Sequence, residues 1–86
     1  MSVPINFYCT APNAKEVFLI GDFNKWNPTA NPLEKKVDGT WFIQLPLKHG
    51  HHHYMFLIDG VSTLDPRASG VGRNEKNERV SLVAVS

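Results

Sequence analysis

The sequence lacks several features, and each absence excludes a class of protein. It contains one cysteine, Cys9, which cannot form an internal disulfide and lies in an alternating segment typical of a small apolar core residue. No apolar run approaches the roughly 20 residues of a membrane-spanning helix. The N-terminal segment MSVPINFYCT has neither the basic n-region nor the apolar h-region of a signal peptide. We therefore expect a cytoplasmic protein.

An excess of either charge is also missing. Nine basic and eight acidic residues give a formal net charge of +1 and are scattered along the chain, without a basic stripe or an acidic tail. Proteins that bind nucleic acid or anionic membranes usually concentrate positive charge on one surface. We therefore expect neither nucleic acid nor a membrane as a partner.

Helical periodicity is absent as well. Apolar residues nowhere recur at helical spacing over a dozen positions, and short alternating or apolar segments are separated by turn residues instead. Two dipeptides typical of hairpin turns, Asp38-Gly39 and Asp59-Gly60, each lie between two such segments. The expected strands span residues 5–10, 16–20, 33–37, 41–45, 53–58, 61–64 and 80–85, with a turn bracketed by Pro46 and Gly50 and a polar stretch over 65–78.

These seven or so strands, joined by short turns, predict an all-β fold, an antiparallel β-sandwich. A chain of 86 residues, of which 42% are apolar, suffices for one core, so we expect residues 1–86 to form a single domain. Tyr54, Phe56 and Ile58 share one face by alternation, and the apolar residues between them share the other, which predicts a central strand. Trp41 is expected to be packed in the core.

No pattern typical of an enzyme is present. Four aspartates lie at strand ends beside glycine, proline or other turn residues, where carboxylates stabilise turns: Asp22, Asp38, Asp59 and Asp65. The chain has no nucleophile motif, no phosphate-binding glycine loop and no zinc-ligand spacing of the closed structural kind. We therefore predict neither catalysis nor a bound cofactor.

Four histidines lie within five residues, at His49, His51, His52 and His53. On an extended strand His51 and His53 share one face while His52 points to the other, so at most a loose pair is available to a metal ion. A complete site would need a further ligand from elsewhere in the chain. We predict a solvated turn and strand start in place of a metal site.

The segment KEVFLIGDFNKW, residues 15–26, runs an apolar strand into a polar turn that ends on Trp26. A large ring in such a turn either closes one end of the core or forms a flat binding surface. Composition alone favours the first alternative, because small domains bury most of the area of their large aromatic residues. The other motifs of the chain bear on this choice.

Five motifs in order resemble the family 48 carbohydrate-binding modules: KEVFLIGDFNKW, DGTWFIQLPL, GHHHYMFLIDG, Leu64-Asp65-Pro66 and VSLVAV. This family includes the glycogen-binding domain of the β subunit of AMP-activated protein kinase and the early-set domain that precedes isoamylases and branching enzymes. The resemblance covers residues 11–85 and implies an immunoglobulin-like β-sandwich of the early-set type. It also implies weak, non-catalytic binding of an α-1,4-glucan such as glycogen or a maltooligosaccharide.

The resemblance assigns one stacking residue and leaves the other sugar contacts unmatched. In the kinase-type modules a tryptophan at the end of this turn stacks on a glucose ring, and that position is Trp26 here. The lysine of the family's YKF triplet is replaced by Met55, and the second stacking tryptophan by Ser62. With residues 74–77 aligned to the family's last binding loop, none of its three contact positions matches: Lys76, Glu78 and Val80.

We expect the carbohydrate site to combine Trp26 with Asn24 and Lys25 from the same turn. A rebuilt last loop would add the donors Arg73, Asn74 and Asn77. The alternative is that residues 70–78 form only a solvated loop.

Two functions therefore remain open. The first is a small α-glucan-binding module, which the retained Trp26 favours. The second is an early-set domain that has lost sugar binding and serves as a docking or regulatory surface for a partner protein or a glucan-active enzyme, which the unmatched positions favour.

Overall fold

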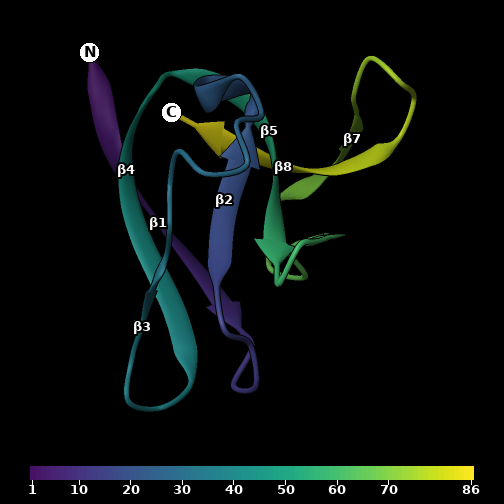
Figure 1. Ribbon diagram of the computed structural model, residues 1–86. Coiled ribbons are helices and arrows are strands. Elements are labelled where there is room, and N and C mark those ends of the chain that lie inside the picture. The colour runs from purple at the N-terminus through teal and green to yellow at the C-terminus, as the bar shows by residue number, and fades with distance from the viewer.

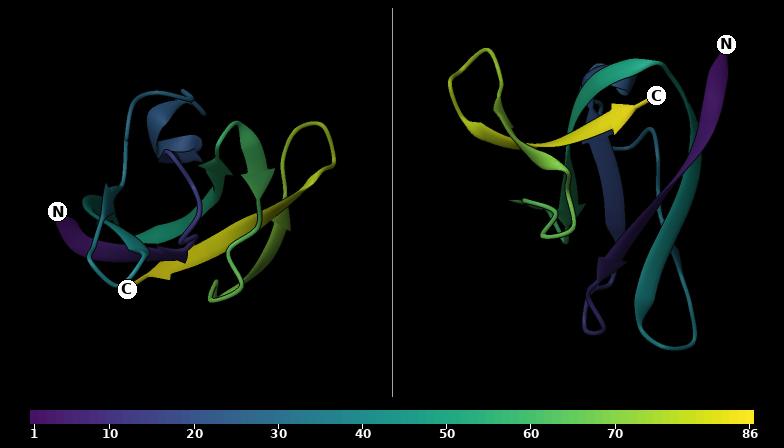
Figure 2. Two further views of the ribbon diagram at one scale, coloured as in Figure 1. Left: turned by 60° about the horizontal axis from the view of Figure 1, so that its bottom comes forward. Right: turned by 180° about the vertical axis from the view of Figure 1, so that it is seen from behind.

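Two antiparallel β-sheets pack face to face in the computed structural model, which describes all 86 residues (Figure 1). The elements in chain order are β1 (Ser2–Thr10), β2 (Val17–Gly21), the short 3-10 helix η1 (Asp22–Asn24), β3 (Glu34–Lys35), β4 (Thr40–Lys48), β5 (Gly50–Ile58), β6 (Val61–Thr63), β7 (Gly70–Arg73) and β8 (Arg79–Val85). Figure 2 gives two further views of the layers. The predicted antiparallel sandwich is confirmed, with eight strands.

One layer is a three-stranded sheet in the order β1-β4-β3. β1 pairs with β4 over its full length. Phe7 and Cys9 on β1 are buried in the core, whereas Tyr8 and Thr10 are exposed, so the predicted alternation of this strand is confirmed. β4 thus lies in the middle of its sheet and contributes Trp41 to the core.

The other layer is a five-stranded sheet in the order β2-β5-β8-β7, with β6 also paired to β5. β5 contacts β2 on one side and both β8 and β6 on the other, because β8 pairs with its first half and β6 with its second half. Its Tyr54 and Phe56 are buried. The prediction of a central strand is confirmed.

Inward-facing residues of both sheets form one hydrophobic core. Ten buried residues belong to it: Phe7, Cys9, Val17, Leu19, Leu33, Trp41, Leu47, Tyr54, Phe56 and Val85. Trp41 is 6% exposed and donates its indole N–H to the carbonyl of Ala11 at 2.9 Å, which satisfies its one polar group. The expectation that Trp41 belongs to the core is confirmed.

Strand β7 was not predicted from the sequence. It lies inside the stretch 65–78 that was expected to be a polar loop, and it pairs with β8 from Gly70 opposite Leu82 to Arg73 opposite Arg79. The segment GVGR carries no alternating apolar pattern, because two of its four residues are glycines. This segment is a strand because it pairs with the strongly apolar β8, and its own residues have little intrinsic preference for a strand.

The turns differ from expectation in two details. Pro46 was expected to open a turn but lies inside β4, directly opposite Pro4 of β1. Proline has no backbone N–H and cannot donate a hydrogen bond to a neighbouring strand. The two prolines can therefore lie opposite each other, at a pair where neither strand requires an N–H from the other. The hairpin at Asp38-Gly39 is confirmed, although only Gly39 has a positive φ there, at 85°.

Both chain ends and η1 lie at one end of the sandwich, and the turn between β7 and β8 projects away from its side (Figure 1, Figure 2). No helix in this chain has the length and apolar character that a membrane crossing requires.

Candidate functional site

The turn that follows β2 is held by a single side chain. Asn24, the last residue of η1, accepts the N–H of Gly21 at 3.0 Å and donates to the carbonyl of Leu19 at 2.9 Å and to the side-chain oxygen of Asn31 at 2.7 Å. Its amide is therefore fully used within the protein. These three bonds fix the path of the chain in the turn that precedes Trp26.

Trp26 follows this turn in a sparsely populated backbone conformation. Lys25 and Trp26 both have φ of 57°, in the left-handed region that bulky residues rarely adopt. The N–H of Trp26 donates to the carbonyl of Gly21 at 2.8 Å, so the turn closes back on the end of β2. Non-glycine residues in this region cost roughly 1–3 kcal/mol and often mark functional sites.

A different aromatic residue closes the core at this end. Phe23 packs against the core, with its ring centroid 6.4 Å from that of Phe7 and 6.2 Å from that of His52. Trp26 is only partly buried and lies outside the core cluster. Two roles were considered for Trp26. The first of them, closing the end of the core, is performed by Phe23 instead.

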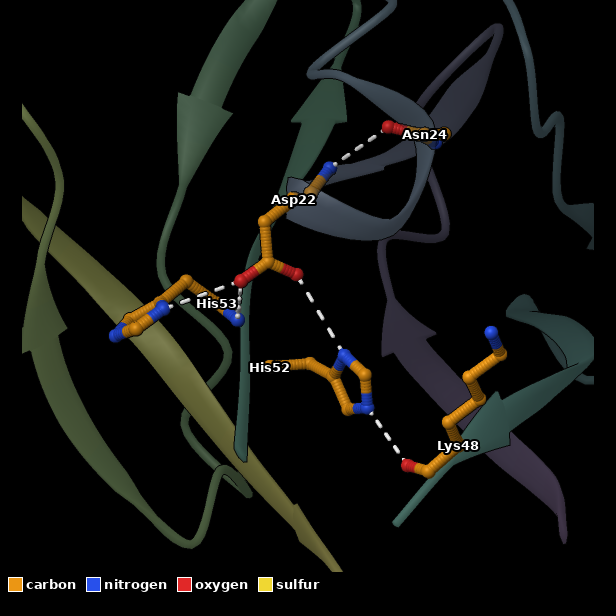
Figure 3. Close-up of polar contacts among 6 residues, drawn as sticks. Asp22, Asn24, Lys48, His52 and His53 are labelled. Carbon is orange, nitrogen blue, oxygen red and sulfur yellow. Dashed lines mark hydrogen bonds and ion pairs between the residues drawn. The ribbon is translucent and has the colours of Figure 1, made fainter. Parts of the chain in front are cut away.

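Asp22 joins two histidines of β5 (Figure 3). β2 ends with Gly21, opposite Tyr54 of β5. The side chain of the next residue, Asp22, accepts the N–H of His53 at 3.0 Å, and this bond takes the place of the next bond between the two strands. One carboxylate oxygen also contacts Nδ1 of His53 at 3.2 Å, and the other lies 3.7 Å from Nδ1 of His52.

The histidine pair expected from alternation, His51 with His53, is therefore not the pair that shares a partner. The carboxylate lies at the edge of β5, so imidazoles on opposite faces of the strand, those of His52 and His53, both reach it. His52 Nε2 also donates to the carbonyl of Lys48 at 2.8 Å. No three His, Cys, Asp or Glu side chains are gathered as metal ligands.

The β7–β8 turn carries the other predicted site residues, and most of their polar groups hold the turn. Asn74 accepts the N–H groups of Lys76 and Glu78 at 3.0 and 2.9 Å, and its own amide donates to the Glu78 carboxylate at 3.1 Å. Arg73 donates from Nη1 to the carbonyl of Asn77 at 2.8 Å. Asn77 is exposed with φ of 63°, which asparagine tolerates better than most residues.

The two groups of predicted residues lie on opposite sides of the outer face of the five-stranded sheet. We define this outer face by the residues that alternate with the core positions: Phe18, Ile20, His53, Met55, Leu57, Ser62 and Leu82. The Trp26 turn lies at its β2 side and the β7–β8 turn at its β7 side (Figure 1). Met55 and Ser62, two of the five unmatched family positions, are on this face.

The outer face is mostly apolar and was not recognised from the sequence. Phe18, Ile20, Met55, Leu57 and Leu82 are each partly exposed on it. Asp22 and His53 could not be identified from the sequence as neighbours of the site, because their contact depends on the register between residues 31 positions apart. The signal that would have located His53 is its alternation with Met55, two residues further on.

Of the four aspartates, Asp38 and Asp65 bond within their own turns as expected, whereas Asp22 and Asp59 accept N–H groups from distant segments of the chain. Asp38 accepts the N–H of Thr40 at 2.9 Å, and this bond lowers the pKa of its carboxyl group. Asp59 accepts two N–H groups, from Lys15 and Glu16, at 2.9 Å each. Burial and a 2.5 Å hydrogen bond to Asp65 raise the pKa of the Tyr54 hydroxyl. These contacts explain the carboxylates as structural groups.

Comparison with known proteins bears on the function of this face. The sequence profile described as carbohydrate-binding module 48 (isoamylase N-terminal domain) matches residues 3–82. Among the curated relatives, a 1,4-alpha-glucan-branching enzyme of Dictyostelium discoideum is 48% identical over 42 residues. The 1,4-alpha-glucan branching enzyme GlgB of Bradyrhizobium sp. (strain ORS 278) is 38% identical over 56 residues. The alignments cover 49% and 65% of this chain but only 6% and 8% of the enzymes, so the chain corresponds to a small part of them.

Proposed function

Because this chain belongs to the carbohydrate-binding module 48 family, with residues 3–82 matching its profile, we propose that it binds α-1,4-glucan, such as glycogen or a maltooligosaccharide, without catalysing a reaction. The single observation that carries this proposal is the position of Trp26. Its ring stays outside the core, in a turn held rigid by Asn24, while Phe23 closes the core instead.

The chemistry of such a site is mainly contact between flat surfaces. The C–H face of a glucose ring against an indole gains dispersion energy over many atom pairs and needs no charge. Lys25, exposed beside Trp26, supplies a donor for sugar hydroxyls, and the remaining N–H groups of Arg73 and the amide of Asn77 supply others across the face. Asn24 contributes by holding the turn, since its own amide has no free donor.

Affinity electrophoresis in gels that contain glycogen tests this proposal. The wild-type chain is expected to be retarded and Trp26→Ala to migrate as it does without glycogen. Tyr8→Ala is the matched control, because Tyr8 is also an exposed aromatic residue but lies on the opposite sheet. Equal retardation of all three proteins would contradict a site at Trp26, and no retardation of the folded wild type would contradict glucan binding.

A second candidate function rests on the apolar character of the outer face. Apart from His53 in its middle, this face presents the partly exposed apolar side chains Phe18, Ile20, Met55, Leu57 and Leu82, and exposed apolar surfaces mark protein interfaces. In this alternative the domain docks a glucan-active enzyme. Sedimentation velocity with a branching enzyme that lacks its own corresponding domain tests it, because Leu57→Lys should abolish a complex that the wild type forms.

A further inference from the structure

His53 is the one polar ring in the middle of the outer face. We propose that His53 is a glucan-binding residue, whose Nε2 accepts a hydrogen bond from a sugar hydroxyl while Asp22 holds its ring in place. This inference rests on the proposed glucan-binding function and names an acceptor for a sugar hydroxyl on the face where Met55 stands in place of the family's ammonium donor.

The orientation of the His53 ring is fixed from two sides. Asp22 contacts Nδ1 at 3.2 Å and also binds the backbone N–H of the same residue at 3.0 Å (Figure 3). On the other side the ring lies against Gly72 of β7, where a Cβ would come within 2.6 Å of the ring carbon Cδ2 and 2.7 Å of Nε2. A side chain held on both sides loses little further freedom when it binds a ligand.

The same contacts determine whether Nε2 is available as a hydrogen-bond donor or as an acceptor. A carboxylate accepts hydrogen bonds, so Nδ1 carries a proton, and in the Nδ1–H tautomer of a neutral imidazole Nε2 presents a lone pair. Nε2 has no partner within the chain, and no side-chain nitrogen or oxygen is both buried and unpaired. The side chain is 36% exposed, so a ligand on the outer face can reach it.

The position of His53 links the two turns of the predicted site. Through Asp22 it contacts the segment that leads into Trp26, and through Gly72 it contacts the hairpin that carries Arg73 and Asn77. Met55 lies two residues further along the same face, at a distance of about 7 Å for an extended strand. A glucan chain that runs from Trp26 towards β7 therefore passes over His53.

The local charges favour a neutral ligand. The carboxylate of Asp22 lies beside the ring, and none of the residues that define the outer face is a lysine or an arginine, so the immediate surroundings of the ring disfavour a phosphate or carboxylate group. A sugar hydroxyl donates to a lone pair without adding charge. The chemistry thus matches an uncharged polyol, which is the class to which glucans belong.

Four variants test this role by calorimetric titration with maltoheptaose. His53→Ala should weaken binding about tenfold, because one hydrogen bond is lost. His53→Gln should keep most of the affinity, since its amide oxygen reaches the place of Nε2. Gly72→Ala should weaken binding like His53→Ala, because the new methyl group displaces the ring. His49→Ala, at an exposed turn histidine, is the matched control and should bind as the wild type does.

Nitrogen NMR of His53 gives a readout that a merely structural role would not change. The free protein should show the Nδ1–H tautomer, and the Nε2 resonance should shift as maltoheptaose saturates the site. If Trp26→Ala abolishes binding while His53→Ala and Gly72→Ala, both folded, bind as the wild type does, the role of His53 is overturned and glucan binding stands. If the folded wild type does not bind, both proposals fail together.

Discussion

At the residue scale, the presentation of Trp26 depends on Asn24. The three hydrogen bonds of its side chain connect η1 to β2 and to the segment around Asn31. They satisfy backbone groups that the end of a strand would otherwise leave open. The strained conformation of Lys25 and Trp26 persists because these bonds determine the path of the chain around it.

Asn24→Ala is therefore expected to lower the free energy of unfolding by about 1–3 kcal/mol, because partly buried backbone groups lose their partners. Glucan binding should weaken with it, since the turn would relax. Urea denaturation measures the first effect. Asn13→Ala, at an exposed asparagine with no side-chain hydrogen bond, is the control and should leave stability unchanged. Equal stability of both variants would show that the turn does not depend on Asn24.

The buried position of Cys9 predicts a slow reaction of its thiol in the native protein. Burial raises the pKa of its thiol, the charge of Asp65 raises it further, and the charge of Arg67 lowers it in part. The thiolate is the reactive form, so the native protein should react with iodoacetamide far more slowly than the urea-unfolded protein at neutral pH. Fast labelling of the native protein, followed by mass spectrometry, would contradict the burial of Cys9 at 7% exposure.

At the scale of elements, close packing of η1 against β5 makes Gly21 a sensitive position. Its backbone is extended, so the restriction is steric: a Cβ there would lie 2.6 Å from the Phe23 ring and 2.7 Å from the carbonyl oxygen of His53. The carbonyl belongs to the backbone of β5 and cannot move without disturbing the ladder. The ring at Gly72, in contrast, is a side chain that can rotate away.

Gly21→Ala is accordingly expected to destabilise the domain by about 1–3 kcal/mol, in the range of overpacked positions. Gly72→Ala should cost much less. Thermal unfolding followed by circular dichroism compares the two. A melting temperature of Gly21→Ala at or above that of Gly72→Ala would be inconsistent with the packing of η1 on β5.

Tyr54 connects β5 to β8 through the loop residue Asp65. Its hydroxyl donates to Asp65, whose N–H in turn donates to the hydroxyl of Ser81 on β8 at 2.8 Å. The raised pKa of Tyr54 means that the unfolded state ionises first, at an ordinary pKa of about 10. Its contribution to stability is thus complete below about pH 10 and is lost as the pH rises further.

Tyr54→Phe should lower stability at neutral pH by about 1 kcal/mol, because Asp65 loses a donor in a partly exposed place. The difference between wild type and variant should shrink above about pH 10, where the wild type alone loses this contribution. Denaturation curves at pH 7 and at higher pH test this. A difference that stays constant with pH would contradict the proposed ionisation behaviour.

The sequence predicted those elements whose pattern is local. The alternation of β1 and of β5, and the Asp59-Gly60 turn with φ of 46° and 84°, follow from neighbouring residues alone. β7 was not predictable in this way, because Gly70 and Gly72 carry no pattern and pairing with β8 alone defines them as a strand.

In the candidate site, too, the features that depend on neighbouring residues could be predicted, and those that depend on strand register could not. The turn that carries Trp26 could be recognised from consecutive residues, whereas the neighbourhood of His53 depends on which residue of β2 lies opposite which residue of β5. The role of Phe23 in closing the core was missed for a similar reason, since both it and Trp26 are aromatic residues of the same turn. Only the packing distinguishes them.

At the scale of the whole molecule, the two candidate functions use one surface. The outer face lies between the Trp26 turn and the β7–β8 turn, and its centre is apolar apart from His53 and Ser62. A glucan and a docked protein would therefore compete for it. The net charge of the chain is only +1, so long-range electrostatic attraction favours neither kind of partner. Aromatic contact and hydrogen bonding therefore decide which partner binds.

We propose that Trp26 stacks on glucan, and intrinsic tryptophan fluorescence during a titration with maltoheptaose detects this contact. The chain has two tryptophans, and Trp41 is buried and bonded to Ala11, so a ligand on the surface should change the emission of Trp26 alone. We predict a saturable change in the wild type and none in Trp26→Ala. A folded wild-type protein whose emission stays constant up to millimolar sugar would contradict the claim.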